Sequence, residues 1–439
     1  MKVNTMNPAA WRGGGGAERM LLLLLLLLAP VACDVFDRAL DVEAPSRIPA
    51  SDLEDPARAT LLVNGAISDF DCAFGAYVVA TGVLADELED ATQTAARWAY
   101  DRRDIDANRD ALYATSGCIG LGVYTPLSVA RWSAENVLTK LEGSIDAQMP
   151  AGVNRLSLLA TAAAYAGYSH LLLGEAFCTG VLLDANLQPG GEVPREELFR
   201  RAEARFTRAI EAAQASANAE ILNMARVGLA RVRLNLGNTA GALEAARSVD
   251  ANFDARVMTA SGVSSRRENR VWAQSNPQSS FNVSVAPQFQ GLTVGGQADP
   301  RVPAQQTSQT SPTGIRVWAQ TKYATAGSPI PIASRDEALL VIAEIEGGQT
   351  AVDIINQFRA TAGLPSFTSS DPVEIQQQVI EERRRELFLE GHRFYDLVRL
   401  NLPLVPAPGT PYRNGGVYGN TTCLPLPAIE RLNNPNFGA

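Results

Sequence analysis

Histidine and cysteine are scarce in this chain. The 439 residues include two histidines, His170 and His392, and five cysteines, and no two cysteines form a C-x-x-C pair. Because zinc sites draw on closely spaced Cys and His ligands, the sequence predicts no metal site, and we expect no other cofactor. A G-x-S-x-G motif is also absent, which counts against serine hydrolase chemistry.

Positive charge is in deficit. Lys and Arg number 38 against 47 Asp and Glu, which gives a net charge of −9. Phosphate neutralisation needs clustered Lys and Arg, so we expect no nucleic-acid partner and no attachment to anionic lipid by charge alone. The 46% hydrophobic and 19% charged content is otherwise typical of a globular protein.

Eight consecutive leucines, Leu21–Leu28, lie near the amino terminus. An apolar run of about ten residues is too short to span a bilayer, which needs about 20, but it suits the hydrophobic region of a secretory signal. We therefore predict that residues 1–32 are a signal peptide and that 33–55 form a polar tether. Translation could also begin at Met6 or Met20.

Cys33 follows the small residues Val31 and Ala32, as in the lipobox of bacterial lipoproteins. Pro30 stands where a lipobox usually has leucine. The sequence predicts acylation of Cys33 and a tethered, not spanning, protein. The alternative is an ordinary cleaved signal with Cys33 as a structural cysteine.

Four further cysteines remain in the exported chain, where disulfides persist. Three pairings of Cys72, Cys118, Cys178 and Cys423 are possible. Cys72 and Cys118 both lie in glycine-rich, loop-like sequence, which favours Cys72–Cys118 and leaves Cys178–Cys423.

Apolar periodicity predicts a mainly α fold, with helical pattern starting at Pro56. The stretches 219–236 and 239–248 place small and large residues at tetratricopeptide spacing, which lets paired helices approach closely. The other predicted helices are 124–142, 154–176, 194–216, 333–346 and 349–361.

Residues 251–330 are polar and rich in Ser, Gln, Asn, Pro and Gly, which predicts an irregular loop and short-strand insertion. Arg270-Val271-Trp272-Ala273-Gln274 recurs as Arg316-Val317-Trp318-Ala319-Gln320. We expect both strings to be short strands.

Asp371-Pro372 begins what the pattern predicts to be one long helix over 371–400. Its apolar positions recur at helical intervals: Ile380, Leu387, Gly391, Phe394 and Val398. The charged residues of the opposite face could form an acid/base cluster, but spacings such as Glu381 to Arg385 favour an ion-pair network.

This segment, Glu382-Arg383-Arg384-Arg385-Glu386-Leu387-x-x-Glu390-Gly391-His392-Arg393-Phe394-Tyr395-Asp396, closely resembles the signature of the SusD/RagB family. Five further stretches match that family in the same order: Asp299-Pro300-Arg301, Lys322-Tyr323, Ser334 to Glu344, Ile355 to Pro365 and Leu424 to Pro435.

The resemblance implies tetratricopeptide-like helix pairs, a SusD-like α-α superhelix, with a SusD-like N-terminal helical region at 56–250 and a RagB/SusD C-terminal region at 251–439. It further implies a non-catalytic, lipid-anchored lipoprotein exposed on the outer membrane. Such proteins bind oligosaccharide or peptide nutrients and deliver them to a SusC-like TonB-dependent transporter.

Two other functions remain open. A secreted glycoside hydrolase would need paired carboxylates, and the densest acidic run is Leu84-Ala85-Asp86-Glu87-Leu88-Glu89-Asp90. Such a run is more typical of a solvated helix end. A periplasmic tetratricopeptide-like scaffold would bind only protein.

A sugar site combines an aromatic face with amide or charged partners. The sequence offers this mixture at Trp98, Tyr100 and Arg102, and at the paired strings with Trp272, Gln274, Trp318 and Gln320. These tryptophans could instead pack the insertion onto the helices.

We predict that Cys33 is the only covalent membrane anchor, since no other apolar stretch is long enough to span a bilayer. Cys33→Ala should move the protein into the soluble fraction on cell fractionation. Retention of the variant in membranes at the wild-type level, in cells without the transporter, would contradict this prediction.

Overall fold

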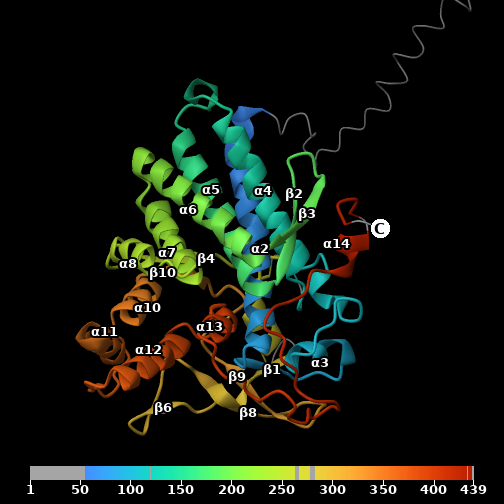
Figure 1. The fold of residues 1–439 in the computed structure, drawn as a ribbon, viewed down its shortest axis with the longest axis vertical. Helices are drawn as coiled ribbons and strands as arrows, with labels where there is room; N and C mark the ends of the chain where they lie inside the picture. The colour runs from blue at the N-terminus through green and yellow to red at the C-terminus, as the bar shows by residue number, and fades with distance from the viewer. Residues whose placement is uncertain (1–54, 119, 263–265, 277–281, 433, 438–439) are drawn as a thin grey trace, which may run out of the picture. The chain divides into compact units, whose positions relative to one another are not determined.

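The computed structural model describes residues 55–118, 120–262, 266–276, 282–432 and 434–437. The predicted signal peptide, Cys33 and nearly all of the tether lie outside the described residues. From Asp55 onward the chain forms one compact unit, in which helices dominate and the strands are short (Figure 1). The mainly α fold class is confirmed.

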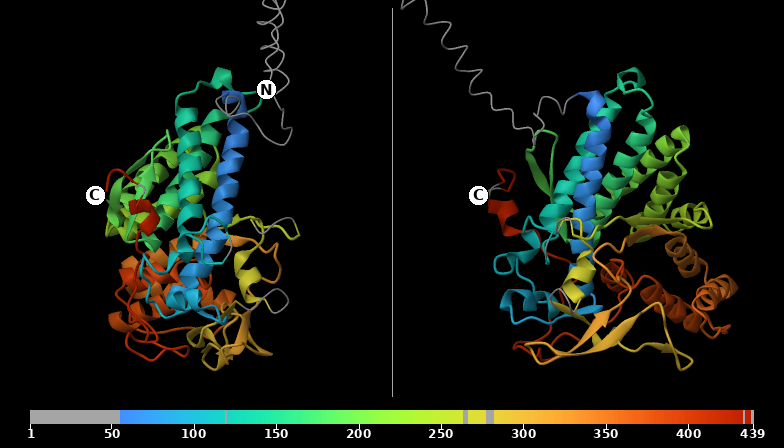
Figure 2. Two further views of the ribbon diagram at one scale, coloured as in Figure 1. Left: turned by 90° about the vertical axis from the view of Figure 1, so that its right-hand side faces the viewer. Right: turned by 180° about the vertical axis from the view of Figure 1, so that it is seen from behind.

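Consecutive helices pack against one another along the first half of this unit. After η2 (Pro56–Arg58), the long α2 (Ala59–Leu84) contacts α4 (Tyr124–Glu142), and each later helix contacts the one before it. Figure 2 shows α2 in blue beside the green helices. The later helices are α5 (Arg155–Ala176), α6 (Arg195–Ser216), α7 (Ala219–Asn235) and α8 (Thr239–Arg247). The predicted helices are confirmed to within two residues.

Small residues let these helices approach closely, as their spacing predicts. The Phe206 ring of α6 lies between Gly167 of α5 and Gly228 of α7, and a Cβ atom at either glycine would overlap the ring. A larger residue at either position would therefore push the helices apart.

The short strands pair in five two-stranded antiparallel sheets within the described residues. The sheets are β1 (Leu88–Asp90) with β5 (Val283–Val285), β2 (Thr179–Leu183) with β3 (Pro189–Pro194), β4 (Asp254–Val257) with β10 (Ile330–Ser334), β6 (Thr293–Val294) with β7 (Gln297–Ala298), and β8 (Ala304–Thr310) with β9 (Arg316–Gln320). The remaining elements are α3 (Ala95–Asp101), η3 (Ala111–Ala114), η4 (Asp146–Gln148), α9 (Arg270–Ser275), η5 (Pro287–Phe289), α10 (Arg335–Glu346), α11 (Gly348–Thr361), α12 (Pro372–Glu386), α13 (Arg393–Arg399) and α14 (Ala428–Leu432).

The two identical five-residue strings adopt different structures. Arg316–Gln320 forms β9, as predicted, but Arg270–Ser275 is the helix α9, so the strand prediction is wrong there. The Asn269 side chain accepts a hydrogen bond from the Trp272 backbone N–H and caps that helix. The two strings thus differ in their partners: β9 pairs with β8, whereas Asn269 caps α9.

The segment 371–400 is two helices, not the one long helix predicted. Between α12 and α13 the backbone turns, with Leu389 at φ 57° and Gly391 at φ 82°. Left-handed residues of this kind cannot continue an α-helix. The apolar face is nevertheless largely buried: Leu387 and Phe394 are 3% and 1% exposed, and Ile380 and Val398 are half-buried.

The charged face of this segment is an ion-pair network, as favoured above. Glu381 pairs with Arg385 at 2.5 Å. Glu382 is fully buried and accepts from Arg301 at 2.5 Å and from Arg359 at 2.7 Å. Arg301 also pairs with Asp299 at 2.8 Å. Motifs far apart in the sequence therefore meet at one buried carboxylate.

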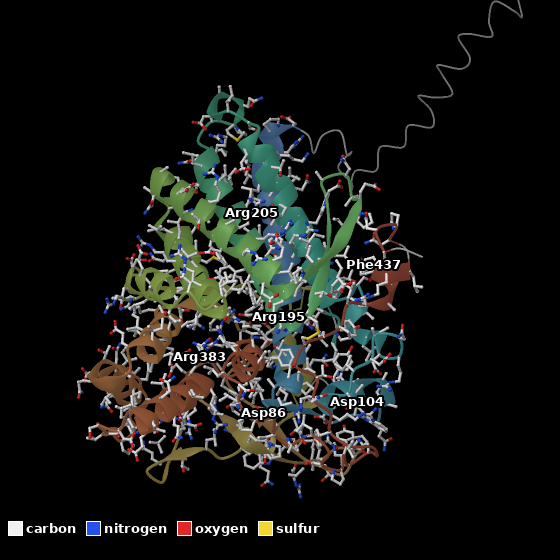
Figure 3. The ribbon with its side chains drawn as sticks, viewed as in Figure 1. Asp86, Asp104, Arg195, Arg205, Arg383 and Phe437 are labelled. Carbon is white, nitrogen blue, oxygen red and sulfur yellow. A yellow bond between two sulfur atoms is a disulfide. The ribbon has the colours of Figure 1, made fainter. Side chains whose placement is uncertain are left out.

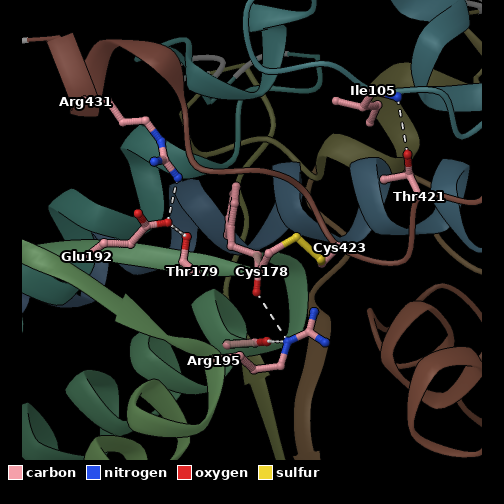
Figure 4. Close-up of a disulfide and its surroundings, with 10 residues drawn as sticks. Ile105, Cys178, Thr179, Glu192, Arg195, Thr421, Cys423 and Arg431 are labelled. Atoms are coloured by element: carbon pink, nitrogen blue, oxygen red, sulfur yellow. Dashed lines mark hydrogen bonds and ion pairs between the residues drawn. A yellow bond between two sulfur atoms is a disulfide. The ribbon is translucent and has the colours of Figure 1, made fainter. Parts of the chain in front are cut away.

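The two favoured disulfides are present. Cys72 pairs with Cys118, with Cα atoms 5.5 Å apart, and Cys178 pairs with Cys423, with Cα atoms 5.1 Å apart. Figure 4 shows the second of these disulfides. Cys72 lies inside α2, so its assignment to a loop is wrong. Backbone hydrogen bonds on either side of the second disulfide join the end of α5 to Leu424.

Two of the described helices are long and apolar enough to cross a membrane, Pro56–Leu84 and Arg155–Ala176. The expectation that no such stretch follows the leucine run is therefore wrong. The burial of 83% and 72% of their apolar windows inside the unit fits core helices.

We predict that Phe394→Ala lowers the free energy of unfolding by about 3–5 kcal/mol, because a large side chain is removed from a packed core. Chemical denaturation measures this loss. Val373→Ala, at a position 63% exposed on α12, is the control and should change stability by less than about 0.5 kcal/mol. A similarly small loss for Phe394→Ala would contradict the prediction.

Candidate functional site

The acidic run at the end of α2 is buried, so its assignment to a solvated helix end is wrong. Asp86, Glu87 and Asp90 are 4%, 1% and 1% exposed. Asp86 pairs with Arg393 at 3.3 Å, and Glu87 accepts a hydrogen bond from the Leu389 backbone N–H at 2.8 Å. Asp90 pairs with Arg97 at 2.5 Å, and Glu89 pairs with Arg413 at 3.1 Å. Asp86, Glu87 and Glu89 therefore join segments that are far apart in the sequence, while the Asp90–Arg97 pair is local.

Burial raises the pKa of Glu87 to about 8 and that of Glu89 to about 7. A carboxylic acid with a raised pKa is what a glycoside hydrolase uses as its proton donor. However, the cavity bordered by Asp86 and Glu89 measures only about 70 Å³. This volume holds a few water molecules and not a sugar ring, so the run is no substrate site.

Three of the predicted ligand-binding residues are buried in the interior. Tyr100 is 0% exposed, and its hydroxyl accepts a hydrogen bond from the Tyr113 backbone N–H. Gln274 and Gln320 are 4% and 5% exposed, and Gln320 bonds within the fold to Tyr323. These side chains present no surface to a ligand, so their assignment to a sugar site is wrong.

The predicted tryptophans divide into two kinds. Trp272 and Trp318 are half-buried and pack against the main hydrophobic core, which is the packing alternative raised above. Trp98 on α3 is half-buried outside that core cluster and donates its indole N–H to the Thr92 carbonyl at 3.1 Å. Arg102 lies one turn further and pairs with Asp104 at 3.1 Å. Trp98 and Arg102 therefore remain predicted ligand contacts.

A cleft of about 430 Å³ lies elsewhere, bounded by α4, α5, α6 and the β2–β3 hairpin. Its lining combines one tryptophan with amides and charges, which is the mixture expected of a sugar site. The lining residues include Arg131, Trp132, Glu135, Asn136, His170, Asp184, Gln188, Arg201 and Arg205. Figure 3 labels Arg205 among the helices, away from Asp86 and Asp104 in the other part of the unit.

Trp132 is held in place by the hairpin. Its indole N–H donates to the Asp184 carbonyl at 2.9 Å. The Asp184 carboxylate in turn accepts from the backbone N–H groups of Asn186 and Gln188, both at 2.8 Å, and this shapes the hairpin turn. The half-buried ring is therefore fixed in orientation before any ligand arrives.

The carboxyl-terminal segment also contacts the hairpin, through an ion pair and two side-chain hydrogen bonds. Arg431 pairs with Glu192 at 2.8 Å, as Figure 4 shows. Asn434 and Asn436 donate side-chain hydrogen bonds to the carbonyls of Gly190 and Pro189 at 2.8 and 2.6 Å. The position of one cleft wall thus depends on residues nearly 250 positions away in the sequence.

Glu135 is the carboxylate on the helical wall of the cleft. It accepts from His170 at 2.9 Å and from Arg205 at 2.8 Å. Burial alone would raise its pKa, but these two hydrogen bonds outweigh that effect and lower the pKa to about 2. Burial lowers the pKa of His170, which donates as a neutral imidazole. Glu135 stays ionised and so cannot act as a general acid.

A second hollow, of about 700 Å³, is lined by paired charges such as Lys322 and Glu390, 2.6 Å apart. Among its lining residues neither Trp nor Tyr is present. It therefore lacks the polar aromatic surface of the Trp132 cleft.

Trp132 was not among the predicted ligand-binding residues. The signal was available, because Trp132, Glu135 and Asn136 share one face of the predicted helix 124–142 at spacings of three and four. What the pattern could not indicate was the hairpin that folds over this face.

Residues 296–422 match the SusD family. This segment is a SusD-family region. No curated protein matches the sequence.

The SusD-like fold extends over the whole described unit. The surface glycan-binding protein A of Bacteroides thetaiotaomicron, solved with laminarihexaose, has a TM-score of 0.66 at 14% identity, over 87% of this chain and 98% of its own. A SusD homologue from the same organism has a TM-score of 0.65 at 15% identity, over 89% and 98%. A laminarin-binding SusD-like protein has 0.62 at 16%, over 84% and 96%. At these identities the likeness establishes the fold.

The SusD-family region contains Asp299, Arg301, Arg359 and Glu382, which form the buried network described above. It does not contain the Trp132 cleft, which lies on the helices before it. The match to the family therefore concerns residues that stabilise the fold. It carries no information about the residues that line the cleft.

We predict that Glu87→Gln reduces the pH dependence of stability. A raised pKa means that the folded state holds the proton more tightly than the unfolded state, so the wild type loses stability as pH rises from about 4.5 to about 8. The amide cannot ionise and avoids this loss. Chemical denaturation at about pH 5 and about pH 8 should show a smaller decrease for Glu87→Gln than for the wild type.

The exposed Glu196→Gln on α6 is the matched control and should follow the wild type. An equal decrease in all three proteins would show that Glu87 ionises normally in the folded state.

Proposed function

We propose that the protein is a non-catalytic surface lipoprotein that binds oligosaccharide and delivers it to a SusC-like TonB-dependent outer-membrane transporter. The observation that carries the binding part is the Trp132 cleft on a SusD-like fold, because two proteins of this fold bind laminarin or laminarihexaose. A peptide is the alternative ligand.

The cleft suits a sugar for a specific physical reason. Sugar rings present apolar C–H faces that stack on an aromatic ring and hydroxyl groups that need hydrogen-bonding partners. Trp132 offers the ring, while Asn136 and Gln188 line the same hollow. Since hydrogen bonds already fix the ring and the hairpin, little ordering is needed on binding.

The enzyme alternative has weaker support. Three of the four carboxyls of the acidic run are buried, each of the four forms an ion pair or a hydrogen bond, and Glu135 in the cleft is held ionised at neutral pH. A glycoside hydrolase needs one protonated carboxyl beside the scissile bond. A periplasmic scaffold that binds only protein would give Trp132 in the cleft no ligand-binding role.

Placement on the cell surface rests on the amino-terminal sequence and on the SusD/RagB resemblance. In this proposal Cys33 carries the lipid, and the polar residues after it separate the folded unit from the outer membrane. Transfer of the ligand to the transporter then needs no diffusion across the periplasm.

We predict that Trp132→Ala weakens binding of the native oligosaccharide at least about tenfold, equivalent to about 1.4 kcal/mol, because the stacking face is lost. Affinity electrophoresis or calorimetry with a glycan panel that includes laminarihexaose measures this effect. The thermal midpoint should stay within a few degrees, since the ring lies outside the main core cluster. Val129→Ala, one turn earlier on α4 and 45% exposed, is the control and should bind normally.

Trp98→Ala and Trp272→Ala test the earlier alternatives. We expect Trp272→Ala to lower the midpoint, because that ring packs on the core. If Trp98→Ala abolishes binding while Trp132→Ala leaves it unchanged, the sugar site lies on α3 and not in the cleft.

A further inference from the structure

The two disulfides differ in their access to solvent. Cys72 and Cys118 are 1% and 4% exposed, whereas Cys178 and Cys423 are both half-buried. A disulfide that solvent reaches is open to attack by a thiolate and is the more labile kind, while a buried one is shielded. A small thiol compound should therefore reduce Cys178–Cys423 in the folded protein before it reaches Cys72–Cys118.

The accessible disulfide fixes the start of the carboxyl-terminal segment, which begins at Cys423. The bond joins Cys423 to Cys178 at the end of α5. Two backbone hydrogen bonds accompany it: the Leu424 N–H donates to the Ala176 carbonyl at 2.8 Å, and the Cys178 N–H donates to the Leu424 carbonyl at 3.0 Å. Among the described residues, the disulfide is the one covalent link between this segment and the helices, apart from the continuous backbone.

The two strands of the β2–β3 hairpin are held by different parts of the chain. On α4, Arg131 donates to the Leu183 carbonyl of β2 at 2.9 Å, and Trp132 donates to the next carbonyl. β3 is held by the carboxyl-terminal segment, through the ion pair and the two side-chain hydrogen bonds described above.

The hairpin has little apolar burial of its own. None of the residues 184–192 is buried, and an isolated two-stranded hairpin is at best marginally stable in water. Pro189 and Gly190, which accept the two hydrogen bonds from the carboxyl-terminal segment, also line the Trp132 cleft. The position of this cleft wall therefore depends on the segment that the accessible disulfide fixes.

We infer that the Cys178–Cys423 disulfide is a redox-sensitive control of the Trp132 cleft. Reduction frees the start of the carboxyl-terminal segment, the contacts of the segment with β3 weaken, and the cleft wall loses its fixed position. A wall that has to be ordered when the ligand binds lowers the affinity. This inference rests on the proposed function, since it concerns the regulation of the same cleft.

The reductant is a dithiol. Its first thiolate attacks one sulfur of the disulfide, the bond between the two cysteines breaks, and a mixed disulfide forms while the other cysteine leaves and takes up a proton. The second thiolate of the reductant then displaces the remaining cysteine from the mixed disulfide. Two electrons and two protons thus pass from the dithiol to the protein, which gains two thiols, and the dithiol becomes a disulfide.

The first test measures selectivity and hairpin motion. The full chain, purified in detergent, is treated with about 1 mM dithiothreitol, alkylated with iodoacetamide and digested for mass spectrometry. Cys178 and Cys423 should be alkylated, while Cys72 and Cys118 should stay joined. Hydrogen exchange of the amides of residues 179–194 should become at least about tenfold faster on reduction, because the hairpin opens more often.

The second test measures the cleft, with laminarihexaose as the probe. Its affinity should fall at least about fivefold on reduction and return when the reductant is removed and the disulfide forms again. Cys178→Ser/Cys423→Ser should bind as weakly as the reduced wild type, and dithiothreitol should change its affinity no further. Because loss of a disulfide also lowers stability, near-UV circular dichroism at the assay temperature checks that each sample is folded.

A further variant separates the contacts of the segment from the disulfide itself. Asn434→Ala/Asn436→Ala removes both donors to β3 and leaves the disulfide intact, so affinity for laminarihexaose should fall at least about threefold. Leu432→Ala, at a position of α14 that is 79% exposed, is the matched control and should bind as the wild type does.

Three outcomes would overturn the inference: unchanged exchange of the hairpin on reduction, reduction of Cys72–Cys118 as fast as that of Cys178–Cys423, and loss of binding only where the circular dichroism of the folded state is also lost. If the oxidised protein does not bind laminarihexaose, or Trp132→Ala leaves binding unchanged, the proposed ligand site fails. The exchange measurement needs no ligand, so it still decides whether the disulfide controls the hairpin.

Discussion

The pairing of one fully buried carboxylate, Glu382, holds the second half of the molecule together. It lies between Arg301 and Arg359, at 2.5 and 2.7 Å, and so joins the loop before β8 and the helix α11 to α12. Charges removed from water persist only when they are paired, and removing one partner of such a pair typically costs about 3–5 kcal/mol. The position of α12 then sets the turn at Leu389 and Gly391, and through it the buried α13.

The same turn links the two halves of the chain. The Leu389 backbone N–H bonds to Glu87 at the end of α2, and Arg393 pairs with Asp86. In the helical half, the Arg231–Glu175 pair receives the Gly391 carbonyl as a further acceptor, 3.3 Å from Arg231. Buried charges thus connect elements that apolar packing alone would leave free to shift, and the acidic run at 84–90 is part of this scaffold.

The cleft differs from this scaffold in how completely its polar groups are paired. Its walls are positioned by the hairpin, the second disulfide and the carboxyl-terminal segment, while its polar groups are only partly satisfied. In the scaffold, carboxylates and arginines pair closely. At the cleft, the buried Nε and Nη2 atoms of Arg131 have no hydrogen-bond partner among the described residues.

The sequence by itself determined where the helices lie, which segment resembles the SusD family and which residue types a sugar site needs, because these depend on local periodicity and residue type. Only the tertiary structure decided the rest. Identical strings at 270–274 and 316–320 became helix and strand through different neighbours. Left-handed residues broke the long helix, and burial removed Tyr100, Gln274 and Gln320 from the predicted site. Trp132 lies in a cleft only because the β2–β3 hairpin, which is distant in the sequence, packs beside α4. Burial and hollows arise from such contacts between remote segments.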